Sequence, residues 1–132
     1  MAKAPWVVAG VAVAVLAGVV LFTRPAGGSQ HPTPRPGITA AKVVPVSFVP
    51  STPGANEAYA AARGAAATLD AMYCHCDCSK HAGHRSLLTC FESNHGAYCD
   101  ICMGEATLAS GMAARGQSLM DIRAAIDRQF GT

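Results

Sequence analysis

Residues 73–78 read Tyr-Cys-His-Cys-Asp-Cys, and three more cysteines follow at Cys90, Cys99 and Cys102. All six cysteines of the 132-residue chain therefore lie between residues 74 and 102. Six thiols this close together indicate one binding site or one set of disulfides, rather than scattered core residues. The rest of the sequence has to be interpreted around this segment.

The alternating cysteines Cys74, Cys76 and Cys78 favour a metal site. In an extended segment, side chains two apart point to the same side, so three sulfurs would face one ion. Neighbours at this spacing are poorly placed to form an unstrained disulfide with each other. Crowded thiolates repel one another unless a cation lies between them, and Cys ligands favour Cu(I) and Zn(II).

The second half of the pattern is Cys99-x-x-Cys102, at the start of a predicted helix. The helix dipole lowers the pKa of a thiol there, which suits a metal ligand or a reactive thiol. Four histidines lie near the thiols, and we expect at least one to be a ligand or to support one. The predicted ligand set is Cys74, Cys76, Cys78, Cys90, Cys99, Cys102, His75 and His84, and the predicted cofactor is Cu(I) or Zn(II).

Two alternatives to metal binding stay open. The six thiols could pair as three disulfides, in one of about 15 connectivities, and staple a small interaction domain. The thiols could instead exchange with disulfides or reduce peroxide, with a thiol near Cys74 attacking and Cys99 or Cys102 resolving. The spacing does not match an iron–sulfur protein or a zinc ribbon, which uses two Cys-x2-Cys pairs.

The part of the chain from residue 54 onward predicts an all-α domain. Apolar residues at helical spacing and capping signals predict about four short helices and no strand. The predicted helices cover residues 55–72, 85–92, 100–114 and 118–130. A core this small and this rich in Ala requires additional stabilisation, which a metal or disulfides would supply.

The N-terminal segment predicts a membrane anchor. Residues 6–22 are almost all apolar, which is close to the roughly 20 residues that cross a bilayer as a helix. Residues 23–26 are a poor cleavage site, so we expect 1–23 to be an uncleaved single-pass signal-anchor. Small stapled domains commonly follow export segments, which places the cysteine-rich domain on the extracytoplasmic (periplasmic) side of the cell membrane.

Composition divides the rest of the chain into a linker and a domain. Residues 24–53 hold seven prolines, which predicts a semi-rigid linker before a domain at residues 54–132. Within the linker, residues 38–49 are more apolar and are expected to lie as a short extended segment against the domain. The domain carries six Lys/Arg against eight Asp/Glu, without a basic cluster, so we expect no nucleic-acid partner.

The motifs together resemble the bacterial PCYCGC-motif proteins, also called the CYCXC family. The resemblance rests on Cys74-x-Cys76-x-Cys78, Cys90-Phe91, Cys99-x-x-Cys102 and a late Ile122-Arg123 pair, and it spans roughly residues 55–131. It implies an exported protein of unassigned function, and selenocysteine in some members implies redox chemistry or soft-metal binding. Tyr73, His75 and Asp77 depart from the proline, tyrosine and glycine of the motif, and no lipidation cysteine follows the apolar run.

These observations favour a cell-envelope protein that binds soft metal, Cu(I) before Zn(II), for storage, delivery or detoxification. Its expected partners are the metal ion, the membrane through the N-terminal helix, and a redox or metal-delivery protein. Hydrolase chemistry finds no support, because the sequence lacks G-x-S-x-G, H-E-x-x-H and a glycine-rich phosphate loop.

Overall fold

The computed structural model describes residues 30–131, and within them every regular element is a helix. The α-helices are α2 (Ala55–Gly64), α3 (Ala66–Asp70), α4 (Cys78–His81), α5 (Asp100–Ala114) and α6 (Leu119–Phe130). The short 3-10 helices are η1 (Ala40–Lys42), η2 (Val46–Phe48), η3 (Leu87–Phe91) and η4 (His95–Tyr98). The all-α prediction is confirmed for this part of the chain. The predicted anchor, residues 1–23, lies outside it. Among the described helices, none combines the length and the apolar character needed to span a bilayer.

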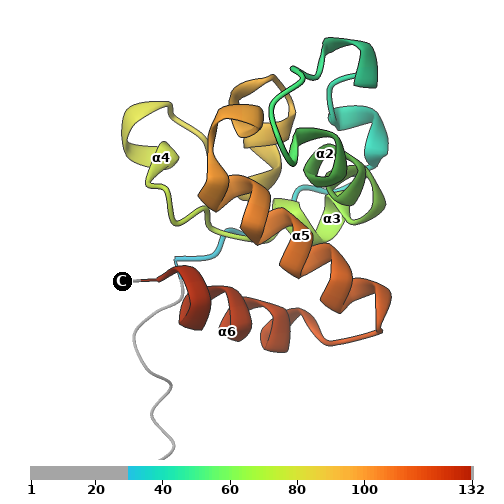
Figure 1. The fold of residues 1–132 in the computed structure, drawn as a ribbon. Coiled ribbons are helices and arrows are strands. Elements are labelled where there is room, and N and C mark those ends of the chain that lie inside the picture. Colours follow the sequence, from blue (N-terminus) through green and yellow to red (C-terminus); the bar gives the residue numbers. More distant parts are fainter. Residues whose placement is uncertain (1–29, 132) are drawn as a thin grey trace, which may run out of the picture.

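Helix α5 lies at the centre of the fold, with α2 packed on one side and α6 on another (Figure 1). It was predicted from its apolar spacing, and its bounds match that prediction. Its interior face carries Cys102, Met103, Glu105, Ala106, Ala109 and Met112, all buried. The small side chains of Ala106 and Ala109 let neighbouring helices pack closely against α5, and the same face carries Cys102 and Glu105 into the interior.

The predicted helix 55–72 is broken at its centre, which corrects the expectation of about four helices. Gly64 ends α2, and Ala65 leaves helical geometry with φ −134° and ψ 33°. Glycine weakens a helix interior because it gains no side-chain contacts and loses more backbone entropy. The break directs the next helix, α3, so that Leu69 and Asp70 are both fully buried.

Two further corrections lie close to the cysteines. The predicted helix 85–92 is the shorter 3-10 helix η3, whose apolar residues Leu87, Leu88 and Phe91 are fully buried. The four-residue helix α4 was not predicted at all, because one turn is too short to produce a periodic pattern. Helix α6 was predicted from its cap, and Ser118 does cap it by accepting the Asp121 N–H at 3.2 Å.

The Pro-rich segment packs against the helices over residues 31–49. Val43 is buried in the core, and the Val44 N–H donates to the Phe91 carbonyl at 2.9 Å. The segment contains the 3-10 helices η1 and η2, where an extended segment was predicted. Proline lacks an N–H donor and blocks longer helices. The regular structure of the Pro-rich segment is therefore limited to single 3-10 turns. The predicted boundary between the linker and the domain, at residue 53, stays a prediction.

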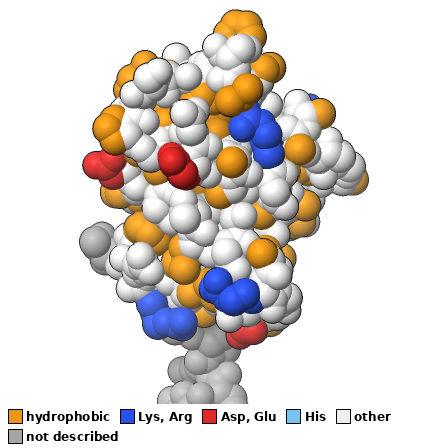
Figure 2. Space-filling model, turned by 45° about the vertical axis from the view of Figure 1, so that its right-hand side comes forward, with side chains coloured by type: hydrophobic (Ala, Val, Ile, Leu, Met, Phe, Trp, Pro, Cys, Tyr) orange, Lys and Arg blue, Asp and Glu red, His pale blue; other side chains and the backbone are white. Residues whose placement is uncertain are grey.

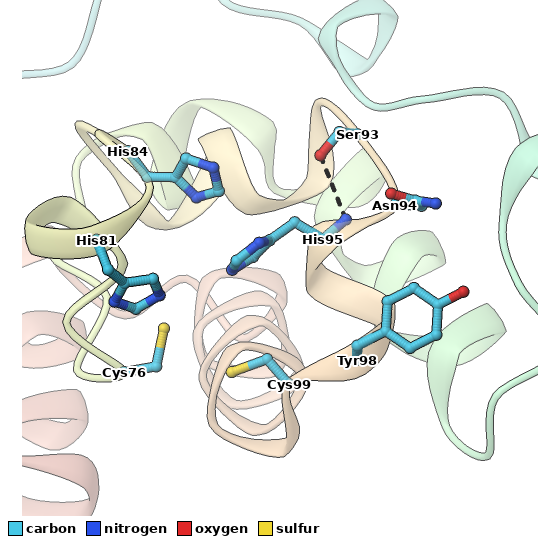
Figure 3. Close-up of a pocket in the computed structure, with 8 residues that line it drawn as sticks. All are labelled: Cys76, His81, His84, Ser93, Asn94, His95, Tyr98 and Cys99. Atoms are coloured by element: carbon cyan, nitrogen blue, oxygen red, sulfur yellow. Dashed lines mark hydrogen bonds between the residues drawn. The ribbon is translucent and has the colours of Figure 1, made fainter.

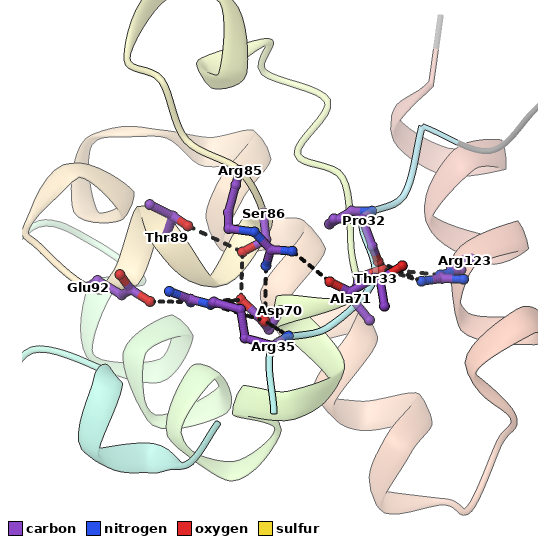
Figure 4. A network of polar contacts seen from close by, with 10 residues as sticks. All are labelled: Pro32, Thr33, Arg35, Asp70, Ala71, Arg85, Ser86, Thr89, Glu92 and Arg123. Carbon is purple, nitrogen blue, oxygen red and sulfur yellow. Dashed lines mark hydrogen bonds and ion pairs between the residues drawn. The ribbon is translucent and has the colours of Figure 1, made fainter. Parts of the chain in front are cut away.

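A buried polar network holds this segment in place (Figure 4). Asp70 is fully buried and accepts from the Arg35 backbone N–H at 2.6 Å and from Arg35 Nη2 at 2.7 Å. Arg85 Nη1 and Ser86 Oγ also donate to Asp70, each at 3.0 Å. Burial alone would raise the pKa of Asp70, but the Arg35 hydrogen bonds outweigh it and hold that pKa below its usual value.

Charged side chains are dispersed over the face shown in Figure 2. One group of Lys or Arg atoms lies near the top of that face and two neighbouring groups lie near the bottom, with Asp and Glu nearby, and no continuous basic patch covers the face. Apolar side chains with high exposure among the described residues include Phe48, Tyr98 and Met120.

Candidate metal centre

The cysteines come together because three segments meet at the first turn of α5. The loop after α3 carries Cys74 and Cys76, and α4 begins at Cys78. The 3-10 helix η3 carries Cys90, and α5 carries Cys102 on its buried face. All six cysteines of the chain are free in the structure.

Cys74, Cys76 and Cys102, which we call the CxC triad, form a nearly equilateral triangle of sulfur atoms. The Sγ–Sγ distances are 3.3 Å for Cys74–Cys76, 3.4 Å for Cys74–Cys102 and 3.5 Å for Cys76–Cys102. A tetrahedral ion bound to thiolates at about 2.3 Å holds its sulfurs about 3.8 Å apart. The triangle therefore needs to widen by only a few tenths of an ångström to accept an ion.

A second cluster lies beside the triad and shares Cys74 with it. Cys74, Cys78 and Cys90 have their sulfur atoms within 4.8 Å of one another, and all three are buried. The Cys78–Cys90 Sγ distance is 3.4 Å. His84 and His95 form a further group with Cys90, and His84 Nδ1 lies 3.3 Å from the Cys90 sulfur.

The thiols perturb one another strongly. Burial raises the pKa of Cys76, and contacts with Cys74 raise it further. The thiols of Cys102 and Cys74 raise the pKa of Cys90. Cys102 behaves in the opposite way, because hydrogen bonds from Cys74 and Cys90 lower its pKa to about 6. One thiolate is thus stabilised by thiols that keep their protons, an arrangement in which a cation can replace those protons.

A pocket of about 540 Å³ opens onto this region (Figure 3). It is lined by Cys76, His81, His84, Ser93, Asn94, His95, Tyr98 and Cys99. In Figure 3 the sulfur atoms of Cys76 and Cys99 face the pocket below the ring of His95. The His84 and His95 ring centres are 4.5 Å apart. Solvent therefore reaches one corner of the CxC triad and the histidine group from the same pocket.

Two predicted ligands lie outside these donor groups. Cys99 is the N-cap of α5, where its sulfur accepts the Cys102 N–H at 3.3 Å. His75 lies in the loop of the triad, but both of its ring nitrogens contact carboxylates. Nδ1 is 2.6 Å from Glu105 Oε1 and Nε2 is 3.1 Å from Asp127 Oδ1. The structure does not bring His75 to the thiols.

Glu105 is a site residue that sequence reasoning missed. It is fully buried, and its Oε2 has no hydrogen-bond partner among the described residues. Its Oε1 also accepts the His75 backbone N–H at 2.9 Å, which fixes the loop between Cys74 and Cys76. Burial raises the pKa of Glu105. The hydrogen bonds with His75 act in the opposite direction, but the effect of burial is larger. The sequence feature that could have identified Glu105 is its position three residues after Cys102, which puts both residues on the same face of the helix.

The comparison with protein families concerns the cysteine motif of the chain. A family model described as a protein of unknown function with PCYCGC motif matches residues 35–132. The chain belongs to the PCYCGC-motif family. The resemblance seen in the sequence is thereby confirmed, and it extends into the Pro-rich segment. Comparisons with curated proteins and with solved structures gave no match.

The PCYCGC motif corresponds to residues 73–78, and the structure explains how this chain departs from it. Asp77 takes the place of the motif's second-last residue, glycine, and has φ 57°, the one positive φ at a non-glycine among the described residues. Aspartate tolerates this left-handed conformation better than most residues. Tyr73, in the place of the proline, donates its hydroxyl to Asp77 Oδ1 at 2.7 Å. The two departures therefore contact each other.

This conformation predicts which residues position 77 accepts. We expect Asp77→Gly to keep the wild-type melting temperature, whereas Asp77→Val lowers it, because a β-branched residue is strained at positive φ. Thermal unfolding of the reduced, metal-free protein measures both. Equal melting temperatures for the two variants would contradict the conformation described.

Proposed function

We propose that this protein binds a soft metal ion, Cu(I) in preference to Zn(II), through the thiolates of its cysteine cluster. The observation that carries the proposal is the CxC triad, in which three free thiols converge with Sγ–Sγ distances of 3.3 to 3.5 Å. Two of its corners, Cys74 and Cys102, are buried, so a bound ion would be shielded from water on that side and accessible from the pocket at Cys76.

The donor set supports a soft ion. The three donor groups contain sulfur and imidazole nitrogen and, within the described residues, no carboxylate. Thiolates select Cu(I) and Zn(II), whereas Ca²⁺ and Mg²⁺ require oxygen ligands. Cu(I) accepts three-coordinate thiolate sites, while Zn(II) usually takes four ligands. The triangular arrangement of the triad therefore favours Cu(I).

The proposal includes a place in the cell. A tether formed by residues 1–23 would hold the metal-binding part at the extracytoplasmic face of the membrane. The role there would be storage, delivery or detoxification of the ion, with a delivery protein as partner. Exposed Tyr98 beside the pocket would be available to such a partner.

Thiol–disulfide exchange is a second candidate, favoured by the lowered pKa of Cys102. The roles are then the reverse of the sequence-based hypothesis, in which Cys102 resolves: the Cys102 thiolate would attack a partner disulfide and release one partner thiolate. Cys74 would then attack the Cys102 sulfur and release the second, so the partner is reduced and the protein oxidised. Cys102 is fully buried, however, while an attacking thiolate needs in-line access to the disulfide. This burial ranks exchange below metal binding.

Native mass spectrometry with elemental analysis tests the proposal. The full chain, exported by its own host and purified anaerobically, is expected to carry copper or zinc at a fixed ratio. The reduced apoprotein should take up Cu(I) and give the ultraviolet absorption of Cu(I)–thiolate bonds. Stray substoichiometric metal, together with no uptake by the reduced apoprotein, would refute metal binding. A mass six hydrogens below the reduced value would point to disulfides.

A further inference from the structure

The three donor groups are joined through shared residues. The CxC triad shares Cys74 with the buried group Cys74–Cys78–Cys90, and that group shares Cys90 with the histidine group. Because the groups share Cys74 and Cys90, the metal-binding side chains form one connected series, from Cys76 at one end to His95 at the other. Both ends line the same pocket, and the middle is buried.

A single ion cannot use this series of donors. The groups contain seven donor residues: Cys74, Cys76, Cys78, Cys90, Cys102, His84 and His95. Zn(II) takes about four ligands in a closed site, so one ion would leave several donors unused. Cys78 and Cys90 would then remain as two buried thiols 3.4 Å apart, with no cation to compensate a thiolate.

We propose that the centre is polynuclear, with one Cu(I) in each donor group, and that His84, His95 and Cys90 form a separate metal site at the pocket wall. This inference rests on the proposed function and deepens it. Cys74 and Cys90 serve as bridging thiolates, each shared by two ions. The seven donors then supply nine ligand positions, three for each of three ions.

The histidine site differs from the thiolate groups in its chemistry and in its access. His84 and His95 are half-buried on the pocket wall, whereas the shared Cys90 is fully buried behind them. A neutral imidazole nitrogen binds an ion without releasing a proton, so only one thiol must deprotonate there. The ion at this site therefore has two nitrogen ligands and one sulfur ligand, and the other two ions have sulfur ligands alone.

His81 supplies a matched control for the histidine site. It lines the same pocket, and its ring centre is 6.3 Å from that of His95. It belongs to none of the three donor groups found in the described residues. His81→Gln therefore removes an imidazole from the pocket and leaves the proposed ligands in place.

The test is anaerobic Cu(I) titration of the full-length protein, followed by native mass spectrometry. Wild type and His81→Gln are expected to bind three Cu(I), and the double variant His84→Gln/His95→Gln two. X-ray absorption of the copper-loaded proteins should show nitrogen neighbours in wild type and His81→Gln, and their loss in the double variant. If the histidines were merely structural, copper in the wild type would have no nitrogen neighbours for the double variant to lose.

The outcomes separate this inference from the function on which it rests. Saturation of wild type at fewer than three ions overturns the assignment of one Cu(I) to each donor group, and an unchanged count in the double variant overturns the histidine site. In either case binding at the CxC triad still supports the proposed function. If the wild-type apoprotein binds no copper at all, both proposals fail. Thermal unfolding of each apoprotein checks that the variants are folded.

Discussion

Replacing Asp70 with alanine is expected to lower the free energy of unfolding by about 3 kcal/mol, because a fully buried carboxylate with several charged donors is removed. Arg35 donates to it from its backbone and its guanidinium, and Arg85 donates from the other side. Without Asp70, these donors lose their shared acceptor and the Pro-rich segment loses its attachment to α3. For a domain of this size the melting temperature should fall by roughly 15 °C.

Glu92→Gln is the matched control for this prediction. Glu92 contacts the same Arg35 guanidinium, but its side chain is 27% exposed and an amide oxygen can still accept the hydrogen bond. We expect a loss of less than about 1 kcal/mol there. Thermal unfolding of reduced, metal-free protein measures both variants. If the two substitutions cost the same, the buried network does not hold the segment as described.

The Asp70 network also sets an acid dependence of stability. The pKa of Asp70 is below its usual value in the folded protein, so between the two pKa values the unfolded chain binds more protons. Stability from this group is complete above about pH 3.9 and is lost as the pH falls through the folded pKa. Asp70→Ala should therefore show a weaker loss of stability below pH 4 than wild type.

Replacing Cys102 with serine is expected to weaken metal binding at the CxC triad strongly. Cys102 is a corner of the CxC triad, 3.4 Å and 3.5 Å from the other two sulfurs. A serine hydroxyl neither deprotonates near neutral pH nor has the softness that Cu(I) prefers. We expect the Cu(I) affinity of the triad to fall roughly a thousandfold, about 4 kcal/mol, in a competition titration with a Cu(I) chelator.

Cys99→Ser carries the same substitution three residues earlier and should behave differently. Cys99 caps α5 with its sulfur, and serine is a better N-cap than cysteine. Its Cu(I) affinity should therefore stay within a few-fold of wild type, and its apoprotein should be at least as stable. If Cys99→Ser lost as much Cu(I) affinity as Cys102→Ser, Cys99 would be a metal ligand. The donor groups described above, which exclude Cys99, would then be incorrect.

The sequence predicted the parts of the fold that depend on local signals. The helix at 100–114 and the helix after Ser118 have long apolar periodicity and a clear cap, and both match the structure. The break at Gly64–Ala65 and the single turn of α4 were missed. Such short features leave little periodic signal, and tertiary packing decides them.

The candidate metal centre also has parts that local sequence predicts and parts that only tertiary packing decides. The alternating spacing of Cys74, Cys76 and Cys78 predicted three sulfurs on one side of an extended segment. The structure brings Cys74 and Cys76 together with Cys102, but places Cys78 in the other group, because the chain turns at Asp77 and a helix begins at Cys78.

Whether a histidine ring faces the thiols depends on contacts with residues that are distant in the sequence. Glu105 and Asp127 contact His75, while His95 comes from the turn before α5 to the wall beside His84.

The sequence by itself determined the helical class of the domain, the cysteine cluster and the soft character of its donors, because these depend on residue type and short spacing. The tertiary structure alone decided that Cys102 completes the triad, that Cys99 caps a helix instead, and that the groups share Cys74 and Cys90. These results depend on how η3, α4 and α5 pack together, and that packing is a property of the whole core.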